Sequence, residues 1–143
     1  MARSFLKGVH HQGQHVLATE PAAAEERIVA EYLFIVTAHQ AGLWLRESCR
    51  LGSVDWDDCG SYLSLIGRIK EVRDMREHAD RYLQGDGDRQ HRFVHHDEQR
   101  NAAADASSTI VTDDGYELGL RVTVEEVMRA ASSALDAVRD ASE

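Results

Sequence analysis

The sequence predicts a mainly α fold, in which a long antiparallel helix hairpin or helical bundle is completed by a small C-terminal β-hairpin and a final helix. Three observations predict this class. The 143 residues contain one proline, at position 21, which suits long helices. Two stretches before residue 85 repeat apolar residues at the three-to-four spacing of a helical face. An Asp-Gly turn near Gly115 separates two short runs that are typical of strands.

The first part of the chain is expected to divide into an arm and a helix. Residues 1–18 show no clean apolar period and predict a flexible N-terminal arm. The single helical domain is expected to span residues 19–143. Thr19-Glu20-Pro21 is typical of a helix start, since it combines a hydroxyl cap, an acid in the first turn and an early proline. The apolar face of that helix is expected to carry Ile28, Tyr32, Ile35, Val36, His39 and Leu43.

A second long helix is expected to begin near Asp55 or Asp58 and to end at Gly85. Its short connection to the first helix, around Gly52, predicts an antiparallel pair over residues 19–85. Residues 86–108 then predict a loop, residues 109–121 a β-hairpin and residues 123–141 a C-terminal helix. Thr123 and Glu126 have the spacing of a capping box at the start of that last helix. No internal repeat or heptad run is evident.

Charge and apolar patterning restrict the function classes. The formal net charge of −9 opposes non-specific binding to anionic polymers, so a nucleic-acid contact requires a local basic patch or a dimer seam. The longest apolar stretch, residues 32–45, is too short for a membrane span, and no signal peptide is evident, so we expect a cytoplasmic protein without membrane contact. Cys49 and Cys59 are expected to be reduced, packed thiols.

The candidate chemistry lies in residues 69–83. Here Arg73 and Asp74 are followed, after three residues, by His78, with Glu77, Asp80 and Tyr82 as neighbours. Cleavage of RNA by its own 2′-hydroxyl needs a group that exchanges a proton near neutral pH, which histidine provides, and a fixed cation near the phosphorus, which arginine provides. Asp74 precedes His78 by one helical turn and is expected to hold its imidazole. The three residues therefore form a candidate catalytic trio.

This Arg-Asp-x-x-x-His run in a long helix resembles the motif of the HEPN superfamily. The resemblance covers residues 19–85 at most. It implies a helical bundle that commonly dimerises, and for many members a metal-independent endoribonuclease of a toxin or defence type, without a cofactor. Arg73, Asp74 and His78 would then be catalytic, and the partners would be a second copy and RNA or a partner protein.

Helix geometry adds a condition to this interpretation. At roughly 100° per residue, Arg73 and His78 lie about 140° apart around a straight helix. One chain would not bring both side chains to one phosphate. The sequence therefore predicts that the two residues meet across the seam of a homodimer.

Three alternatives stay open from the sequence. The charges of the segment are also explained as surface pairs four residues apart, namely Arg73–Glu77, Asp74–His78, Arg76–Asp80 and Glu77–Arg81. The same polar face also suits a non-catalytic interaction or dimerisation module. Finally, His91 and His95 would share one face of a helix with a spacing suited to a metal such as Zn²⁺, and histidines of the arm could complete that site.

Overall fold

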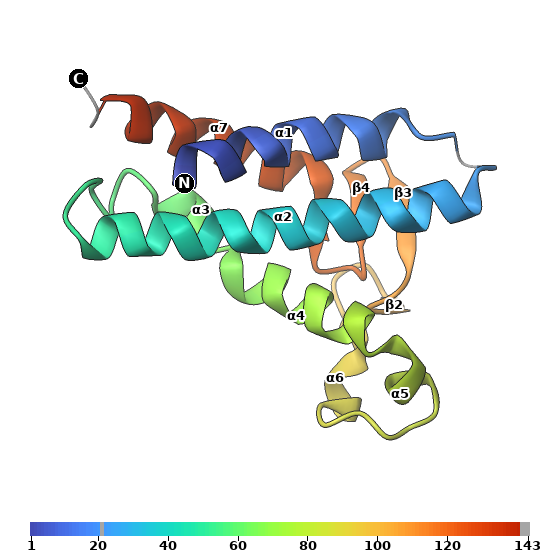
Figure 1. The fold of residues 1–143 in the computed structure, drawn as a ribbon. Coiled ribbons are helices and arrows are strands. Elements are labelled where there is room, and N and C mark those ends of the chain that lie inside the picture. The colour runs from blue at the N-terminus through green and yellow to red at the C-terminus, as the bar shows by residue number, and fades with distance from the viewer. Residues whose placement is uncertain (21, 141–143) are drawn as a thin grey trace.

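Three long helices form the body of the molecule. The computed structural model describes residues 1–20 and 22–140, apart from the side chain of Asp140. Helices α1 (Ala2–Ala18), α2 (Ala24–Arg50) and α7 (Val124–Asp140) lie side by side, and α1 packs against both others. Helix α2 returns in the direction opposite to α1 (Figure 1).

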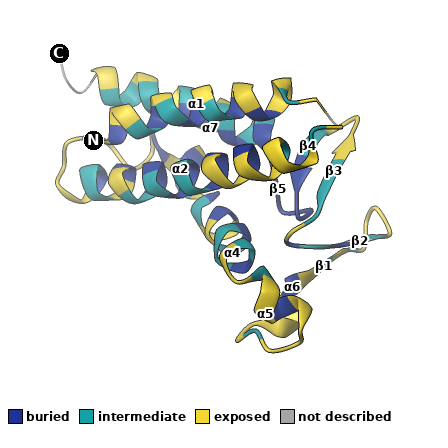
Figure 2. Cartoon of the chain, turned by 45° about the vertical axis from the view of Figure 1, so that its right-hand side comes forward, coloured by how far each residue is buried: buried dark blue, intermediate teal, exposed yellow. Residues whose placement is uncertain are grey.

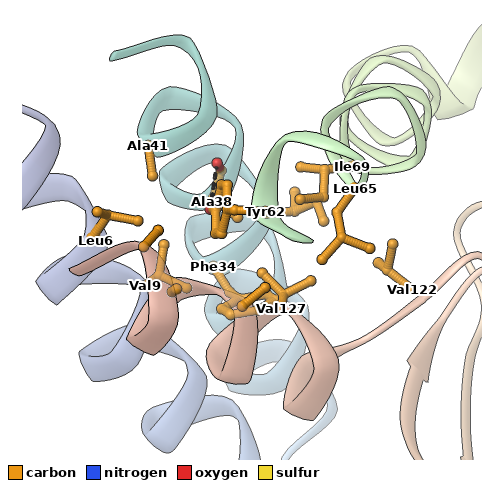
Figure 3. Close-up of a cluster of buried hydrophobic side chains, with 14 of the residues drawn as sticks. Leu6, Val9, Phe34, Ala38, Ala41, Tyr62, Leu65, Ile69, Val122 and Val127 are labelled. Atoms are coloured by element: carbon orange, nitrogen blue, oxygen red, sulfur yellow. Dashed lines mark hydrogen bonds between the residues drawn. The ribbon is translucent and has the colours of Figure 1, made fainter. Parts of the chain in front are cut away.

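The core lies between these three helices and the segment that follows α2. Figure 3 shows apolar side chains from α1, α2, α7 and the region of residues 62–69 converging on one another. Leu6, Val9 and Phe34 have no exposed surface, and neither does Tyr62. The Tyr62 hydroxyl donates a hydrogen bond to the carbonyl of Ala38 at 2.8 Å, so the one polar atom of this large side chain is satisfied inside the core.

The remaining elements are short. After α2 come α3 (Gly60–Leu63), α4 (Ile66–Glu77), α5 (Ala79–Leu83) and α6 (Gln90–Phe93). Strands β1 (Val94–Asp97) and β2 (Ala102–Asp105) pair antiparallel, with Val94 opposite Asp105. A second antiparallel sheet has the order β3 (Thr109–Thr112), β4 (Gly115–Leu118) and β5 (Val122–Thr123), with Thr109 opposite Leu118. In Figure 1, α4 runs obliquely away from α2 on the side opposite α1, and α5 and α6 project away from the long helices.

The predicted fold class is wrong as stated. Helices make up most of the described residues, but the described chain holds two small antiparallel sheets in place of one hairpin, so the fold mixes a helical body with a β region. Residues 86–108, predicted as a loop, contain α6, β1 and β2. The hairpin of β3 and β4 gains a third strand in β5.

The expected flexible arm is also wrong, since residues 2–18 form α1. The buried residues of this helix, Ala2, Leu6, Val9, Gly13 and Val16, follow the spacing of a helical face. Thr19 therefore ends α1 instead of starting α2, and its hydroxyl donates to the carbonyl of His15 at 2.8 Å. The predicted early proline, Pro21, and residue 141 of the predicted last helix lie outside the described residues.

The second predicted long helix is broken into α3, α4 and α5. One break falls at Ser64 and Leu65, and the other at His78, whose backbone (φ −122°, ψ 27°) is not helical. The capping box at the start of α7 is confirmed: Glu126 N–H donates to Thr123 Oγ1 at 3.0 Å, and Thr123 N–H donates to Glu126 Oε1 at 3.1 Å. Cys49 and Cys59 are free and buried, as expected.

Helix α2 bears on the question of a membrane. Among the described helices, it is the one that is long and apolar enough to cross a membrane, judged by length and composition alone. The expectation that the apolar stretch is too short for a membrane span is therefore corrected. Half of its apolar window is buried inside the molecule, and the core helix of a soluble protein passes the same test. This is weak evidence for a span, and the structure is compatible with a soluble protein.

The packing of α1 is tested by truncating one of its side chains. Leu6→Ala should lower the free energy of unfolding by about 2–5 kcal/mol, because it leaves a cavity in a closed core. Leu17→Ala is the matched control on the same helix, since Leu17 is 43% exposed, and should change the free energy by no more than about 0.5 kcal/mol. Urea denaturation followed by circular dichroism measures both; equal values would contradict a docked α1.

Candidate functional site

Arg73 lies at the centre of a polar cluster between α4 and α2. Its Nε donates to Asp74 Oδ1 at 3.0 Å, and its Nη2 also contacts that carboxylate. Its Nη1 lies 2.6 Å from Nδ1 of His39 on α2. Lys70, one turn earlier, contacts the other oxygen of Asp74. The guanidinium is thus held in one orientation while N–H groups of its five-donor fork stay available to a ligand.

His39 and Asp74 hold Arg73 in different charge states, because the imidazole is neutral and the carboxylate is negative. Burial, and after it the positive charge of Arg73, lowers the pKa of His39, so the imidazole is neutral and its Nδ1 accepts from the guanidinium. Partial burial would raise the pKa of Asp74, but hydrogen bonds from Lys70 and Arg73 outweigh it and the net shift is downward. His39, expected on the apolar face of α2, is 4% exposed and its ring is paired with Arg73.

Arg73 and His78 line one cavity of about 330 Å³. Helix α4 ends at His78, whose backbone is not helical, and the two side chains border this cavity from within one chain. His78 is exposed, and within the part of the chain that the structure describes no hydrogen bond or ion pair engages its imidazole. The expected Asp74–His78 contact is therefore wrong, because the Asp74 carboxylate binds Lys70 and Arg73 instead.

The other predicted site residues divide between the cavity and the packing around it. Glu77 lines the cavity, lies 3.8 Å from Arg73 Nε and accepts from the hydroxyl of Tyr32 at 3.4 Å. Tyr82 also borders it, but its ring is buried and stacks on Phe93 with 5.1 Å between the centroids, which indicates a packing role. Asp80 is exposed and is not part of the cavity wall.

The cavity lining is acidic on balance. Four carboxylates face two guanidiniums there: Glu71, Asp74, Glu77 and Asp88 against Arg73 and Arg89. All four carboxylates have cationic partners, but Asp88 is largely exposed and its contact with Arg81, at 3.9 Å, is long. Such a lining attracts phosphate only where Arg73 itself faces the ligand.

The predicted metal pair does not share a helix. His91 lies in α6 and His95 in β1, because the helical turn ends at Phe93. Both border a second cavity, but among the described residues no three potential metal ligands gather at one point. The histidines of α1 lie on the opposite side of the long-helix layer, and His10 pairs with Ser132 of α7 at 2.8 Å.

A buried ion pair that the sequence did not indicate fixes α4 against α2. Arg76 Nη1 donates to Glu31 Oε2 at 2.7 Å, and both side chains are almost fully enclosed. The other oxygen of Glu31 accepts from the hydroxyls of Thr109 and Tyr116 at 2.8 and 2.6 Å. Burial and this contact with Glu31 raise the pKa of Tyr116. The predicted Arg76–Asp80 surface pair is thus wrong, because Arg76 points inward. The one sequence clue to this buried pair was the position of Glu31, which lies four residues before the core residue Ile35 and so on the same side of the helix.

Helix α2 leaves an apolar face without cover. Yellow bands in Figure 2 mark exposed residues along this helix. Val29 is 57% and Leu33 45% exposed, whereas Val36 is half-buried and packs in part against the core. The same face continues through Gln40 and Leu43, with alternating steps of four and three residues, the spacing of a coiled-coil seam. Ile28, Tyr32 and Trp44 flank it as exposed large apolar side chains.

Comparison with protein-family models, with curated proteins and with solved structures yields no match to this chain.

The contact of His39 with Arg73 predicts a specific pH dependence of stability. Folding lowers the pKa of His39 from 6.5, so the unfolded chain binds a proton more readily than the folded one. The free energy of unfolding therefore decreases as the pH is lowered through and below 6.5. Replacing His39 with Gln removes this contribution, so the variant should lose less stability than the wild type between about pH 7 and about pH 5. The contribution of Asp74 is lost only at lower pH, since its ordinary pKa is 3.8.

Urea unfolding at several pH values measures the difference. His11→Gln on the exposed side of α1 is the control and should follow the wild type. Parallel pH profiles for the wild type and His39→Gln would show that the imidazole is not held neutral.

Proposed function

We propose that this chain is a HEPN-like homodimeric helical protein of the cytoplasm that acts as a metal-independent endoribonuclease of a toxin or defence type. The observation that carries the proposal is the shared cavity of Arg73 and His78, a held cation and an accessible imidazole on one wall. The RNA 2′-hydroxyl would attack the adjacent phosphorus and form a 2′-O–P bond, its proton passing to the His78 imidazole. Arg73 would stabilise the charge on the phosphorane, and the bond from phosphorus to the 5′-oxygen would break, with that oxygen taking a proton from water.

The homodimer part of the proposal is supported by the apolar face of α2. An antiparallel pairing with its twofold axis at Val36 places Val29 opposite Leu43 of the second copy. Glu25 and Arg46 lie at nearly equal distances from Val36, both are exposed, and this pairing sets them against each other across the axis. A parallel pairing would instead oppose like charges. Charge complementarity therefore favours a second, antiparallel copy as the occupant of this face.

The dimer also bears on the cavity. His39 follows Val36 by about one helical turn, and it contacts Arg73. Pairing at Val36 would bring the Arg73 clusters of the two copies near the twofold axis, so each would have a second arginine close by.

A second candidate function is the non-catalytic interaction module. The observation that favours it is the excess of carboxylates in the cavity, which repels a phosphate backbone. Under this alternative the α2 face still binds a second copy or a partner protein, and the Arg73 cluster holds α4 against α2.

Cleavage of labelled single-stranded RNA in excess EDTA tests the catalytic proposal. The wild type should cut, while Arg73→Ala and His78→Ala should each lower the rate by about a hundredfold or more, the typical contribution of a positioned acid, base or oxyanion donor. Asp80→Asn, a change outside the cavity, should keep the wild-type rate. Full activity in either of the first two variants would remove that residue from the mechanism, and no cleavage by the wild type would favour the interaction module.

Oligomeric state tests the α2 pairing. The wild type should have the mass of a dimer in light scattering after size exclusion, and Leu33→Glu should shift it to the monomer, because burying the new charge is unfavourable. Arg46→Glu alone should weaken the dimer, and adding Glu25→Arg should restore it, since the two changes exchange the proposed charges. Leu17→Glu on α1 is the control for an exposed leucine. A monomeric wild type, or Leu33→Glu that stays dimeric, would refute this seam.

A further inference from the structure

A basic cavity lies next to the acidic one. It has a volume of about 450 Å³ and is bordered by Arg68 of α4, Arg92 of α6 and Arg121 of the segment between β4 and β5. His91 and His95 face it as well, and Glu71 is the only carboxylate in its wall. In a chain with a formal net charge of −9, three guanidiniums at one cavity are an unusual concentration of positive charge.

Arg121 is built into the base of this cavity. Its side chain is 4% exposed, and Nε donates to Glu71 Oε2 at 3.1 Å. Its Nη1 donates to the carbonyl of Gly119 at 3.0 Å, and Nη2 contacts the carbonyl of Arg92. The turn that presents it has left-handed backbone at Gly119 (φ 59°) and at Leu120 (φ 55°). A non-glycine residue in that region is strained, so the surrounding contacts hold Arg121 in place at a cost.

The two outer arginines retain freedom to meet a ligand. Arg92 is 53% exposed, and its Nη2 lies 2.8 Å from Glu71 Oε1. That oxygen is buried and has no hydrogen-bond partner among the described residues, so the ion pair with Arg92 lacks the alignment of a hydrogen bond. Arg68 is about half exposed; its Nη1 donates to the carbonyl of Arg121 at 2.9 Å and lies 3.4 Å from Glu126 Oε1, so its Nη2 is the group that remains for a ligand. An anion in the cavity would gain charge-assisted hydrogen bonds from both.

We propose that this cavity binds a backbone phosphate of single-stranded RNA through Arg68, Arg92 and the buried Arg121. His91 and His95 each carry a ring N–H that can donate to the sugar or to an adjacent phosphate. This inference rests on the proposed function for its substrate class, but the site itself rests on the cavity and its arginines. It also supplies the local basic patch that an acidic chain requires for nucleic acid.

Glu71 connects the two sites. It borders both cavities, so the basic cavity and the Arg73–His78 cavity are neighbours separated by one side chain of α4. A strand held by one phosphate in the basic cavity would extend past Glu71 toward Arg73. The acidic lining around His78 then does not have to attract the polymer, because binding energy is supplied beside it.

Binding of a short fluorescein-labelled RNA, followed by anisotropy in the His78→Ala background, tests the site without cleavage. Arg92→Ala and Arg68→Ala should each weaken binding about tenfold or more, the scale of a lost charge-assisted hydrogen bond, and lower the salt dependence by about one ion each. Arg92→Lys keeps the charge and should recover part of the affinity. Arg139→Ala on the far end of α7 is the matched control and should bind like the parent. Circular dichroism and urea midpoints confirm that each variant is folded.

The outcomes separate this site from the proposed catalysis. Loss of RNA binding in the Arg68 and Arg92 variants, but not in Arg139→Ala, supports the site. If the wild type in addition cuts no RNA, the proposed ribonuclease is wrong and the binding site stands. Equal binding by all variants, or no RNA binding at all, overturns the site even if RNA is cleaved. Titration with inorganic phosphate, followed by amide chemical shifts, distinguishes a phosphate of RNA from a free phosphate as the ligand. If phosphate binds in a way that depends on Arg92 and RNA does not bind, the ligand is a small phosphate and the RNA assignment is overturned.

Discussion

The arrangement of the other elements depends on the ion pair and hydrogen bonds that the Glu31 carboxylate makes. This carboxylate is buried in α2, and a charge in that position is tolerated only when it is paired and fully hydrogen-bonded. Arg76 of α4 pairs with one oxygen, and hydroxyls of β3 and β4 bind the other. Arg76 also donates to the carbonyl of Ala106 at 3.1 Å. The helix, the sheet and the loop before it are therefore joined at one point, and Arg73, one turn before Arg76, is directed toward α2.

Much of the helical body could be predicted from the sequence, because its signals are local. The span of α2 and the capping box of α7 depend on residues close together in the chain. The period of α1 was also present in Leu6, Val9, Gly13 and Val16, but glycines and histidines between them conceal it. Strands β1 and β2 were missed because alanine and histidine have low strand propensity, and their pairing is supported by surroundings that the sequence does not show. The exposed apolar face of α2 could not be told from its buried face, because that helix is apolar on both sides.

The residues of the candidate site stand out in the sequence, but their geometry does not. Arg73 and His78 are marked by their spacing, whereas neither the cavity that they share nor the helix break at His78 has a local signal such as a glycine or proline. His39 and Glu71 act across elements, so their contacts with Arg73 and Arg121 are visible only in three dimensions. The basic cavity likewise draws its arginines from three separate segments.

The small second core has a consequence for how the molecule opens. Met75, Tyr82, Phe93 and Ala106 form a buried cluster apart from the main one. Segments held by few apolar contacts unfold locally at a lower free energy than the whole domain. Residues 79–106 pack on this smaller cluster and contribute residues to the walls of both cavities, so we expect them to open at a lower free energy than the three long helices. Amide hydrogens of α6 and β1 would then exchange ahead of those in α2.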